Sequence, residues 1–139
     1  MQRTLFIIKP DGVERNLLGK ILAHVEGKGF RVVEARTHQL TEAEAREFYA
    51  EHRERPFFGD LVSYMTTGPV LLICLEREDA VAYLRTVVGA TDPAEAAEGT
   101  VRKLYGVSKQ SNSVHASDSP ESAARELTIF FGKELAASA

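Results

Sequence analysis

The chain has 139 residues, a usual length for one domain, and 44% of them are hydrophobic, which is enough for a core without disulfide support. The formal net charge of -3 argues against a protein whose main task is coating nucleic acid, and the single cysteine excludes an internal disulfide. No signal peptide is evident, and the longest apolar run, 69–75, is too short to span a bilayer. We therefore expect one domain over residues 1–139, located in the cytoplasm, with no membrane association and no specific nucleic-acid binding.

Strand-like and helix-like patterns alternate along the chain. Short apolar, β-rich runs bounded by turn residues predict strands, and apolar residues at helical spacing predict helices. A capping box at 41–44 and the pair Ser119-Pro120 mark two of the helix starts. In chain order, the predicted elements are a strand over 4–8, a helix over 17–25, a strand over 30–38, helices over 41–49 and 57–65, a strand over 70–75, a helix over 79–88, a strand over 113–117 and a helix over 120–131.

This order predicts an α+β fold of the ferredoxin-like type. We expect an α/β sandwich in which a four-stranded antiparallel sheet is covered by helices on one face. Residues 89–110 carry mixed signals with short helical pieces, and such a long irregular segment in a compact domain is more often functional than idle.

The stretch from Asn112 to Pro120 holds the most informative residue, His115. A strand carries this imidazole directly before a helix start, where unpaired backbone N–H groups attract anions. A lone histidine in a strand is more often structural than catalytic. Glu126, about two turns into the following helix, can reach back toward His115 and orient the ring. The other histidines, 24, 38 and 52, lie in separate elements and are expected to be surface or capping residues.

Other chemical motifs are absent from the sequence. The glycines near residues 12 and 19 do not have the spacing of a nucleotide-phosphate loop, and no cluster of cysteine and histidine predicts a metal site built by the protein. Polar residues nevertheless occur at the ends of strands and helices, where they are available to a polyphosphate: Lys9, Arg85, Thr91, Arg102 and Asn112. Phe57 is either a core residue or a ring on which a base can stack.

Residues 112–119 resemble the active-site signature of the nucleoside diphosphate kinases. The similarity runs from Arg3 to about Phe131. Further family motifs match in order at 4–13, 53–58, 67–70, 89–93 and 99–102. The resemblance implies a phosphotransferase that moves the γ-phosphate of a nucleoside triphosphate, mainly ATP, onto a histidine and then onto a nucleoside diphosphate. This ping-pong reaction tolerates many bases and maintains ribo- and deoxyribonucleoside triphosphate pools.

The resemblance also implies a role for each matching residue. His115 matches the nucleophile, and Glu126, Ser117 and Tyr49 match residues that hold and polarise it. Lys9 and Arg102 match contacts of the transferred phosphate, with Lys9 also at the ribose hydroxyl, and Arg85 and Thr91 match contacts of the β-phosphate. Asn112 matches the ribose-binding amide, and Phe57 matches the base-stacking ring with Leu61 beside it. The family uses Mg²⁺ carried mainly by the nucleotide phosphates, and it forms homo-oligomers, either tetramers or hexamers built from dimers.

Three positions depart from the family pattern. Ala116 follows the histidine where glycine is usual, residues 103–105 replace Gly-Asp-Phe, and Lys109 stands where an aliphatic side chain often covers the base. Two other functions are compatible with part of the pattern. One is a non-enzymatic module that binds a nucleotide or effector, and the other is a relay that passes phosphate from a histidine to a protein.

Overall fold

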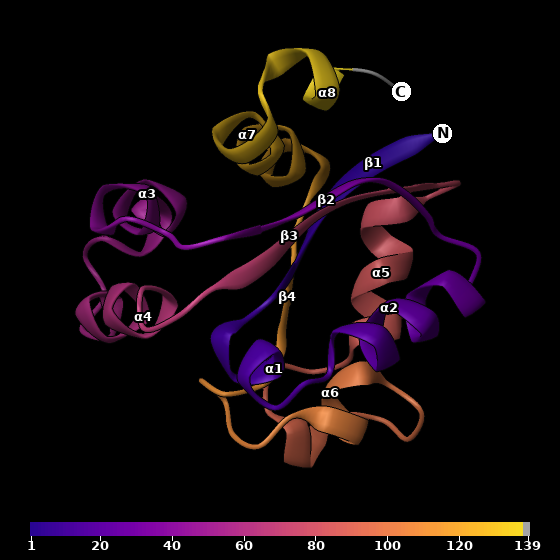
Figure 1. Ribbon diagram of the computed structural model, residues 1–139, viewed down its shortest axis with the longest axis horizontal. Coiled ribbons are helices and arrows are strands. Elements are labelled where there is room, and N and C mark those ends of the chain that lie inside the picture. Colours follow the sequence, from indigo (N-terminus) through magenta and orange to yellow (C-terminus); the bar gives the residue numbers. More distant parts are fainter. Residues whose placement is uncertain (138–139) are drawn as a thin grey trace.

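A four-stranded antiparallel sheet in the order β2-β3-β1-β4 runs through the middle of the molecule (Figure 1). The strands are β1 Gln2–Ile8, β2 Arg31–His38, β3 Val70–Arg77 and β4 Val114–Ala116. This computed structural model describes residues 1–137, so the last two residues of the expected domain lie outside the described part. The predicted α+β, ferredoxin-like sandwich with a four-stranded antiparallel sheet is confirmed.

Helices and two 3-10 turns connect the strands. They are α1 Pro10–Glu14, α2 Leu18–Gly27, α3 Glu42–Phe48, η1 Ala50–His52, α4 Phe58–Met65, α5 Ala80–Val88, η2 Pro93–Glu95, α6 Val101–Tyr105, α7 Pro120–Phe131 and α8 Lys133–Ala137. Helix α3 begins at the predicted capping box, in which the backbone N–H of Glu44 donates to the Thr41 hydroxyl at 3.1 Å and the backbone N–H of Thr41 donates to the Glu44 carboxylate at 2.9 Å. Helices α1 and α8 were not predicted. Turn chemistry was expected at the position of α1, where Pro10 also suits a first helical turn.

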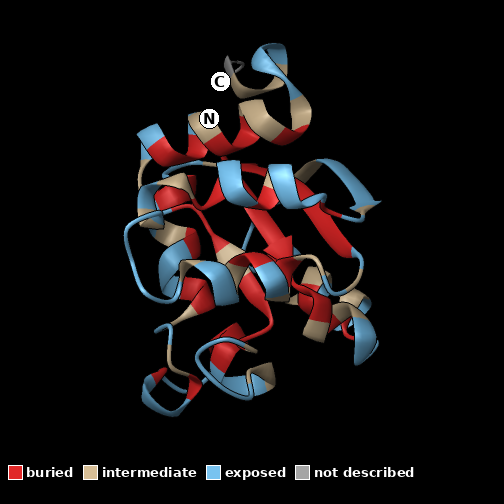
Figure 2. Cartoon of the chain, turned by 90° about the vertical axis from the view of Figure 1, so that its left-hand side faces the viewer, coloured by how far each residue is buried: buried red, intermediate tan, exposed pale blue. Residues whose placement is uncertain are grey.

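Helices cover both faces of the sheet, so the expectation of helices on one face is wrong. In β1, Phe6 and Ile8 pack with α2, α5 and α6, whereas Leu5 and Ile7 pack with α3, α4 and α7 (Figure 1). Strands β1 and β3 are apolar along most of their length because neighbours cover them on both sides. Figure 2 shows the buried residues gathered in the sheet and on the inner sides of the helices. No helix within residues 1–137 is long and apolar enough to cross a membrane.

The short strand β4 brings the informative stretch beside the end of β1. The register pairs Ile7 with His115 and Ile8 with Val114. The backbone N–H of Lys9 then donates to the Ser113 carbonyl at 2.8 Å, so the residue after β1 lies next to the residues before β4. Strand β4 was predicted to begin at Ser113, but Ser113 has a φ of 77° and cannot continue an extended strand.

Candidate active site

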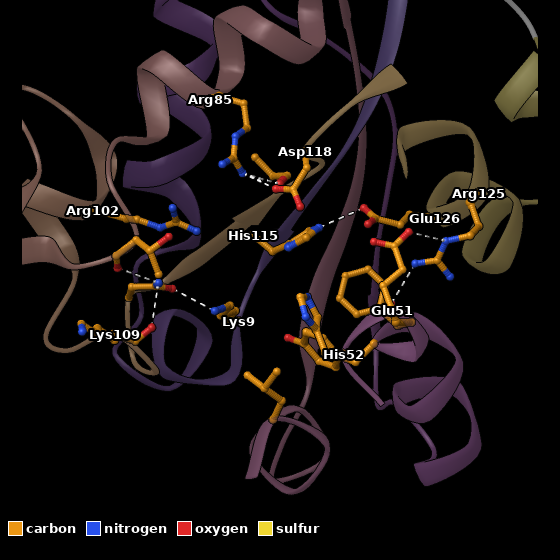
Figure 3. Close-up of a pocket in the computed structure, with 16 residues that line it drawn as sticks. Lys9, Glu51, His52, Arg85, Arg102, Lys109, His115, Asp118, Arg125 and Glu126 are labelled. Carbon is orange, nitrogen blue, oxygen red and sulfur yellow. Dashed lines mark hydrogen bonds and ion pairs between the residues drawn. The ribbon is translucent and has the colours of Figure 1, made fainter. Parts of the chain in front are cut away.

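A pocket of about 290 Å³ opens around His115, between β4 and the helices α3, α4 and α7 (Figure 3). Nine of the eleven residues singled out in the sequence line it. They are Lys9, Tyr49, Leu61, Arg85, Thr91, Arg102, Asn112, His115 and Glu126. Ser117 and Phe57 are the two that do not line it. The topology therefore brings together side chains from most of the chain length.

The imidazole of His115 is held at one nitrogen by a carboxylate. Its Nε2 lies 2.9 Å from Glu126 Oε1, and the hydroxyl of Ser117 donates to the same oxygen at 2.7 Å. A carboxylate oxygen only accepts hydrogen bonds, so in the neutral ring Nε2 carries the proton and Nδ1 carries the free lone pair. The reach of Glu126 toward His115, predicted from helix geometry, is confirmed. Ser117 contacts the imidazole only through Glu126.

Glu126 is ionised despite its burial. Burial alone would raise the pKa of Glu126, but the hydrogen bonds from His115 and Ser117 and the charge of His115 lower it further than burial raises it. Tyr49 lies near this carboxylate at the end of α3 and is buried. Its burial and the Glu126 charge raise the pKa of the Tyr49 phenol, so its hydroxyl stays protonated.

Lys9 and Asn112 form a buried pair on the opposite side of the pocket. The Lys9 ammonium donates to Asn112 Oδ1 at 2.9 Å, and the amide nitrogen of Asn112 donates to the carbonyls of Thr91 at 3.0 Å and Lys109 at 2.9 Å. Burial, with a further contribution from the Arg102 charge, lowers the pKa of Lys9 to about 8. Lys9 is therefore a cation at neutral pH that has lost most of its water.

Two arginines complete the positive side of the pocket. Arg102 is buried and donates to the carbonyls of Gly89 at 3.0 Å and Val114 at 2.9 Å. Burial, with the charge of Arg85, lowers the pKa of Arg102 to about 10, so it is charged at neutral pH. Arg85 is more exposed and donates to Asp118 Oδ1 at 2.6 Å (Figure 3). Three cations therefore approach the imidazole from the side opposite Glu126.

The outer part of the pocket belongs to η1 and α4. Leu61 and the exposed Thr91 both line the pocket. Phe57 precedes α4 and is 42% exposed, outside the pocket wall, with its ring 5.8 Å from that of His52. His52, expected as a surface or capping residue, is half-buried and lines the pocket.

Sequence reasoning missed several residues of the pocket wall: Phe48, Glu51, Asp118 and Arg125. Asp118 stands inside the stretch that contains His115, and Arg125 precedes Glu126, so proximity in sequence was the signal available for both. Phe48 was predicted only as part of a helix. Its ring packs edge to face against the His115 ring, with the centroids 4.8 Å apart.

The three departures from the family pattern have simple structural settings. Ala116 belongs to strand β4, where L-residues are unstrained, and it packs in the core with α2 and α5. Residues 103–105 form the end of helix α6, where the Tyr105 carbonyl accepts a hydrogen bond from the Ser113 hydroxyl at 3.0 Å. Lys109 lines the pocket, and its carbonyl holds the Asn112 amide.

An imidazole that is held at Nε2 by a carboxylate and faced by cations suits the transfer of a phosphoryl group. Catalysis of such a transfer depends mainly on aligning the reacting groups and on neutralising the charge of the phosphates. The fold and the pocket therefore define a phosphotransferase that works through a histidine.

Comparison with known proteins gives the family. The protein-family model described as nucleoside diphosphate kinase matches residues 2–135 of this chain. A nucleoside diphosphate kinase of Chlorobium chlorochromatii is 57% identical over 134 residues, 96% of each chain. One of Sorangium cellulosum is 56% identical over 140 residues, which cover 100% of this chain and 97% of the relative. The solved structure of the Aquifex aeolicus nucleoside diphosphate kinase superposes with a TM-score of 0.92 at 45% identity, covering 94% of both chains.

The chain belongs to the nucleoside diphosphate kinase family. Members of this family are phosphotransferases of nucleotide metabolism that act by a ping-pong mechanism through a phosphohistidine.

Proposed function

We propose that this chain transfers the γ-phosphate of a nucleoside triphosphate, mainly ATP, to a nucleoside diphosphate through phosphorylated His115. The reaction is ping-pong, has broad base tolerance and maintains ribo- and deoxyribonucleoside triphosphate pools. The observation that carries the proposal is the state of the His115 ring. Its Nε2 is engaged by Glu126, which leaves Nδ1 as the nucleophile in a pocket that contains Lys9, Arg85 and Arg102.

The reaction consists of two displacements at phosphorus. In the first, the Nδ1 lone pair attacks the γ-phosphorus, the bond from phosphorus to the bridging β,γ-oxygen breaks, and the diphosphate leaves with that electron pair. In the second, a terminal β-phosphate oxygen of another nucleoside diphosphate attacks the phosphorus, and the P–N bond breaks. Glu126 stabilises the positive charge that develops on the ring during phosphorylation, and Ser117 and Tyr49 hold Glu126 and the ring in place.

The positive side of the pocket provides the contacts for the phosphates. Lys9 and Arg102 contact the transferred phosphate, and Arg85 and Thr91 contact the β-phosphate. Arg85 exchanges Asp118 for phosphate oxygens, an exchange that its partial exposure favours. Because Arg102 and Lys9 are already fixed by hydrogen bonds, their charges need little rearrangement to stabilise the transition state.

The nucleoside occupies the outer part of the pocket. Asn112 and Lys9 contact the ribose hydroxyls, and the base stacks on Phe57 with Leu61 beside it. A stacked ring contacts the face of a base and reads no base edge, which accounts for broad tolerance. The exposure of Phe57 agrees with a ring that is available to a ligand.

We propose Mg²⁺ as the cofactor. Mg²⁺ is usually held by substrate phosphates with one or two carboxylates, and the exposed carboxylate of Asp118 fits that role in this pocket. No group of three or more metal-binding side chains gathers within the described residues 1–137. When bound, the ion neutralises phosphate charge. The protein side chains align the phosphates and hold the imidazole.

The remaining proposals concern the setting of the enzyme. We propose a single domain over 1–139 that acts in the cytoplasm, without membrane or specific nucleic-acid binding. We also propose a homo-oligomer, a tetramer or hexamer built from dimers, as the family pattern implies.

A labelling experiment tests the function. The protein is incubated with Mg²⁺ and ATP labelled at the γ-phosphate, and GDP is then added. We expect an acid-labile label on the protein before GDP is present, and its complete transfer to GTP afterwards. Absence of the label, or full labelling of His115→Ala, contradicts the proposal. A label that only a protein acceptor removes indicates a relay, and nucleotide binding without any label indicates a binding module.

A further inference from the structure

We propose that Arg125 and Phe48 act as one positioning unit that fixes the plane of the His115 ring. This inference rests on the proposed function, because the plane of the ring determines the direction of the Nδ1 lone pair. Neither residue is needed to bind the nucleotide in this proposal. Both act through the imidazole.

The hydrogen bond to Glu126 fixes one atom of the ring and leaves its tilt open. The second contact comes from Phe48, whose ring lies 4.8 Å from the imidazole centroid at an interplanar angle of 75°. Edge-to-face pairs at this separation are favourable, and they have a preferred orientation. The contact with Phe48 therefore restricts the tilt that the hydrogen bond allows.

Phe48 is itself held firmly by its surroundings. Its side chain is 3% exposed, and its ring packs edge to face on Tyr49 with centroids 4.8 Å apart and lies 5.6 Å from Phe130. A buried ring packed on Tyr49 and Phe130 has little freedom to move apart from its backbone. The position of the C-terminal end of α3 thus sets the position of the ring.

Arg125 fixes that end of α3. Its guanidinium donates to the carbonyls of Glu47 at 3.1 Å and Phe48 at 3.0 Å. Carbonyls at a helix C-terminus have no partner within the helix, and a cation there is favourable. Glu51 also lines the pocket, and its Oε1 lies 3.7 Å from Arg125 Nε (Figure 3).

The sequence places these two functions on adjacent residues of α7. Arg125 holds the helix end that carries Phe48, and Glu126 holds His115 Nε2. Any shift of α3 relative to α7 would move the Phe48 ring against the imidazole. Arg125 opposes that shift because it holds the backbone of Phe48, the residue whose ring contacts the imidazole.

The test measures single-turnover phosphorylation of the full-length protein by Mg²⁺ and ATP, together with the steady-state KM. The variants are Arg125→Met, Arg125→Lys, Phe48→Leu and the double variant Arg125→Met/Phe48→Leu. Arg46→Met is the control, because Arg46 is an exposed arginine of the same helix α3 and pairs with Glu42. All rates are taken well below each variant's melting temperature and per folded protein.

Misplacement of a reacting group by about 1 Å can cost about 100-fold in rate, so a tilt of one ring should cost about tenfold. We expect the phosphorylation rate to fall about tenfold in Arg125→Met and in Phe48→Leu, with the KM for ATP within about twofold of wild type. The phosphorylation rate of Arg125→Lys should lie between those of wild type and Arg125→Met, because the lysine ammonium can donate to one of the two carbonyls that the guanidinium holds. The control should stay within about twofold.

The double variant decides whether the two residues act together. If they form one unit, the double variant loses about tenfold, whereas independent effects would multiply to about a hundredfold. Multiplied effects, or single variants that phosphorylate at the wild-type rate, overturn the inference. A changed KM with an unchanged rate also overturns it. If wild type itself gains no label on His115, it is the proposed function that has failed.

Discussion

Replacing Lys9 by methionine should make the protein more stable and inactive. Lys9 is buried, and burial with the Arg102 charge lowers its pKa from 10.5 to about 8. Each unit of pKa shift corresponds to about 1.36 kcal/mol, so keeping the ammonium charged at pH 7 costs the folded state about 3.4 kcal/mol. The variant loses the charge-assisted hydrogen bond to Asn112, which contributes about 1.5 kcal/mol. The net expectation is a gain of about 2 kcal/mol at pH 7.

The pH dependence follows from the direction of the shift. Between pH 8 and 10.5 the unfolded chain keeps the Lys9 proton that the folded chain has released, so the wild type gains stability as the pH rises through this range. The advantage of Lys9→Met should therefore shrink by about 2 kcal/mol between pH 7 and pH 9.5.

Urea unfolding of both proteins at these two pH values measures the difference, and a coupled assay of ATP formation measures activity. Lys9→Arg serves as the comparison, because an arginine keeps its charge throughout the range. A Lys9→Met variant that is less stable than wild type at pH 7, or a difference that does not change with pH, would refute the reasoning. Retained activity would remove Lys9 from the phosphate site.

Three further predictions concern other residues. Glu126→Gln can present an amide N–H to Nε2 and move the ring proton to Nδ1, so kcat should fall by at least ~100-fold, with the tautomer change visible by ¹⁵N NMR; an unchanged tautomer would contradict this. Arg85→Met should raise the KM for ATP by about 10- to 100-fold with a smaller effect on kcat, because a charge-assisted contact to phosphate is lost; an unchanged KM would place Arg85 outside the nucleotide site. Gly89→Ala should destabilise the fold by about 2 kcal/mol, since Gly89 has a φ of 93° and a Cβ would lie 2.6 Å from the Thr100 hydroxyl. Gly59→Ala, with nothing within 4 Å, is the control in the same melting experiment, and equal melting temperatures would disprove the strain at Gly89.

The sequence pattern was sufficient for the strands and the long helices, because their apolar residues repeat at the spacing of each element. It did not reveal that helices cover both faces, although the continuous apolar runs of β1 and β3 are typical of strands buried on two sides. The start of β4 was also missed. Ser113 has a positive φ, and its hydroxyl donates to Asp11 and Tyr105 in other parts of the chain; no local pattern encodes these contacts.

Some contacts in the pocket could be predicted from the local sequence, and others depend on the folded topology. The link between His115 and Glu126 follows from the pitch of one helix, so local reasoning found it. Phe48 reaches the same imidazole from a helix that is 67 residues away in the chain, and only the folded topology brings them together. The sequence pattern marks Lys9, Arg85 and Arg102 only as cations available to a polyphosphate, and the resemblance to the family supplied their individual roles.

The hydrogen bonds of Arg102 and Asn112 have a consequence for binding. Arg102 ties Gly89 to Val114, and Asn112 joins Lys9, Thr91 and Lys109, so the irregular segment between α5 and β4 is attached to the sheet at several points. The entropy lost in ordering this wall is lost when the chain folds, before any nucleotide arrives. Nucleotide binding therefore has a smaller ordering cost, and the attraction between the phosphates and these cations contributes more fully to affinity and to stabilisation of the transition state.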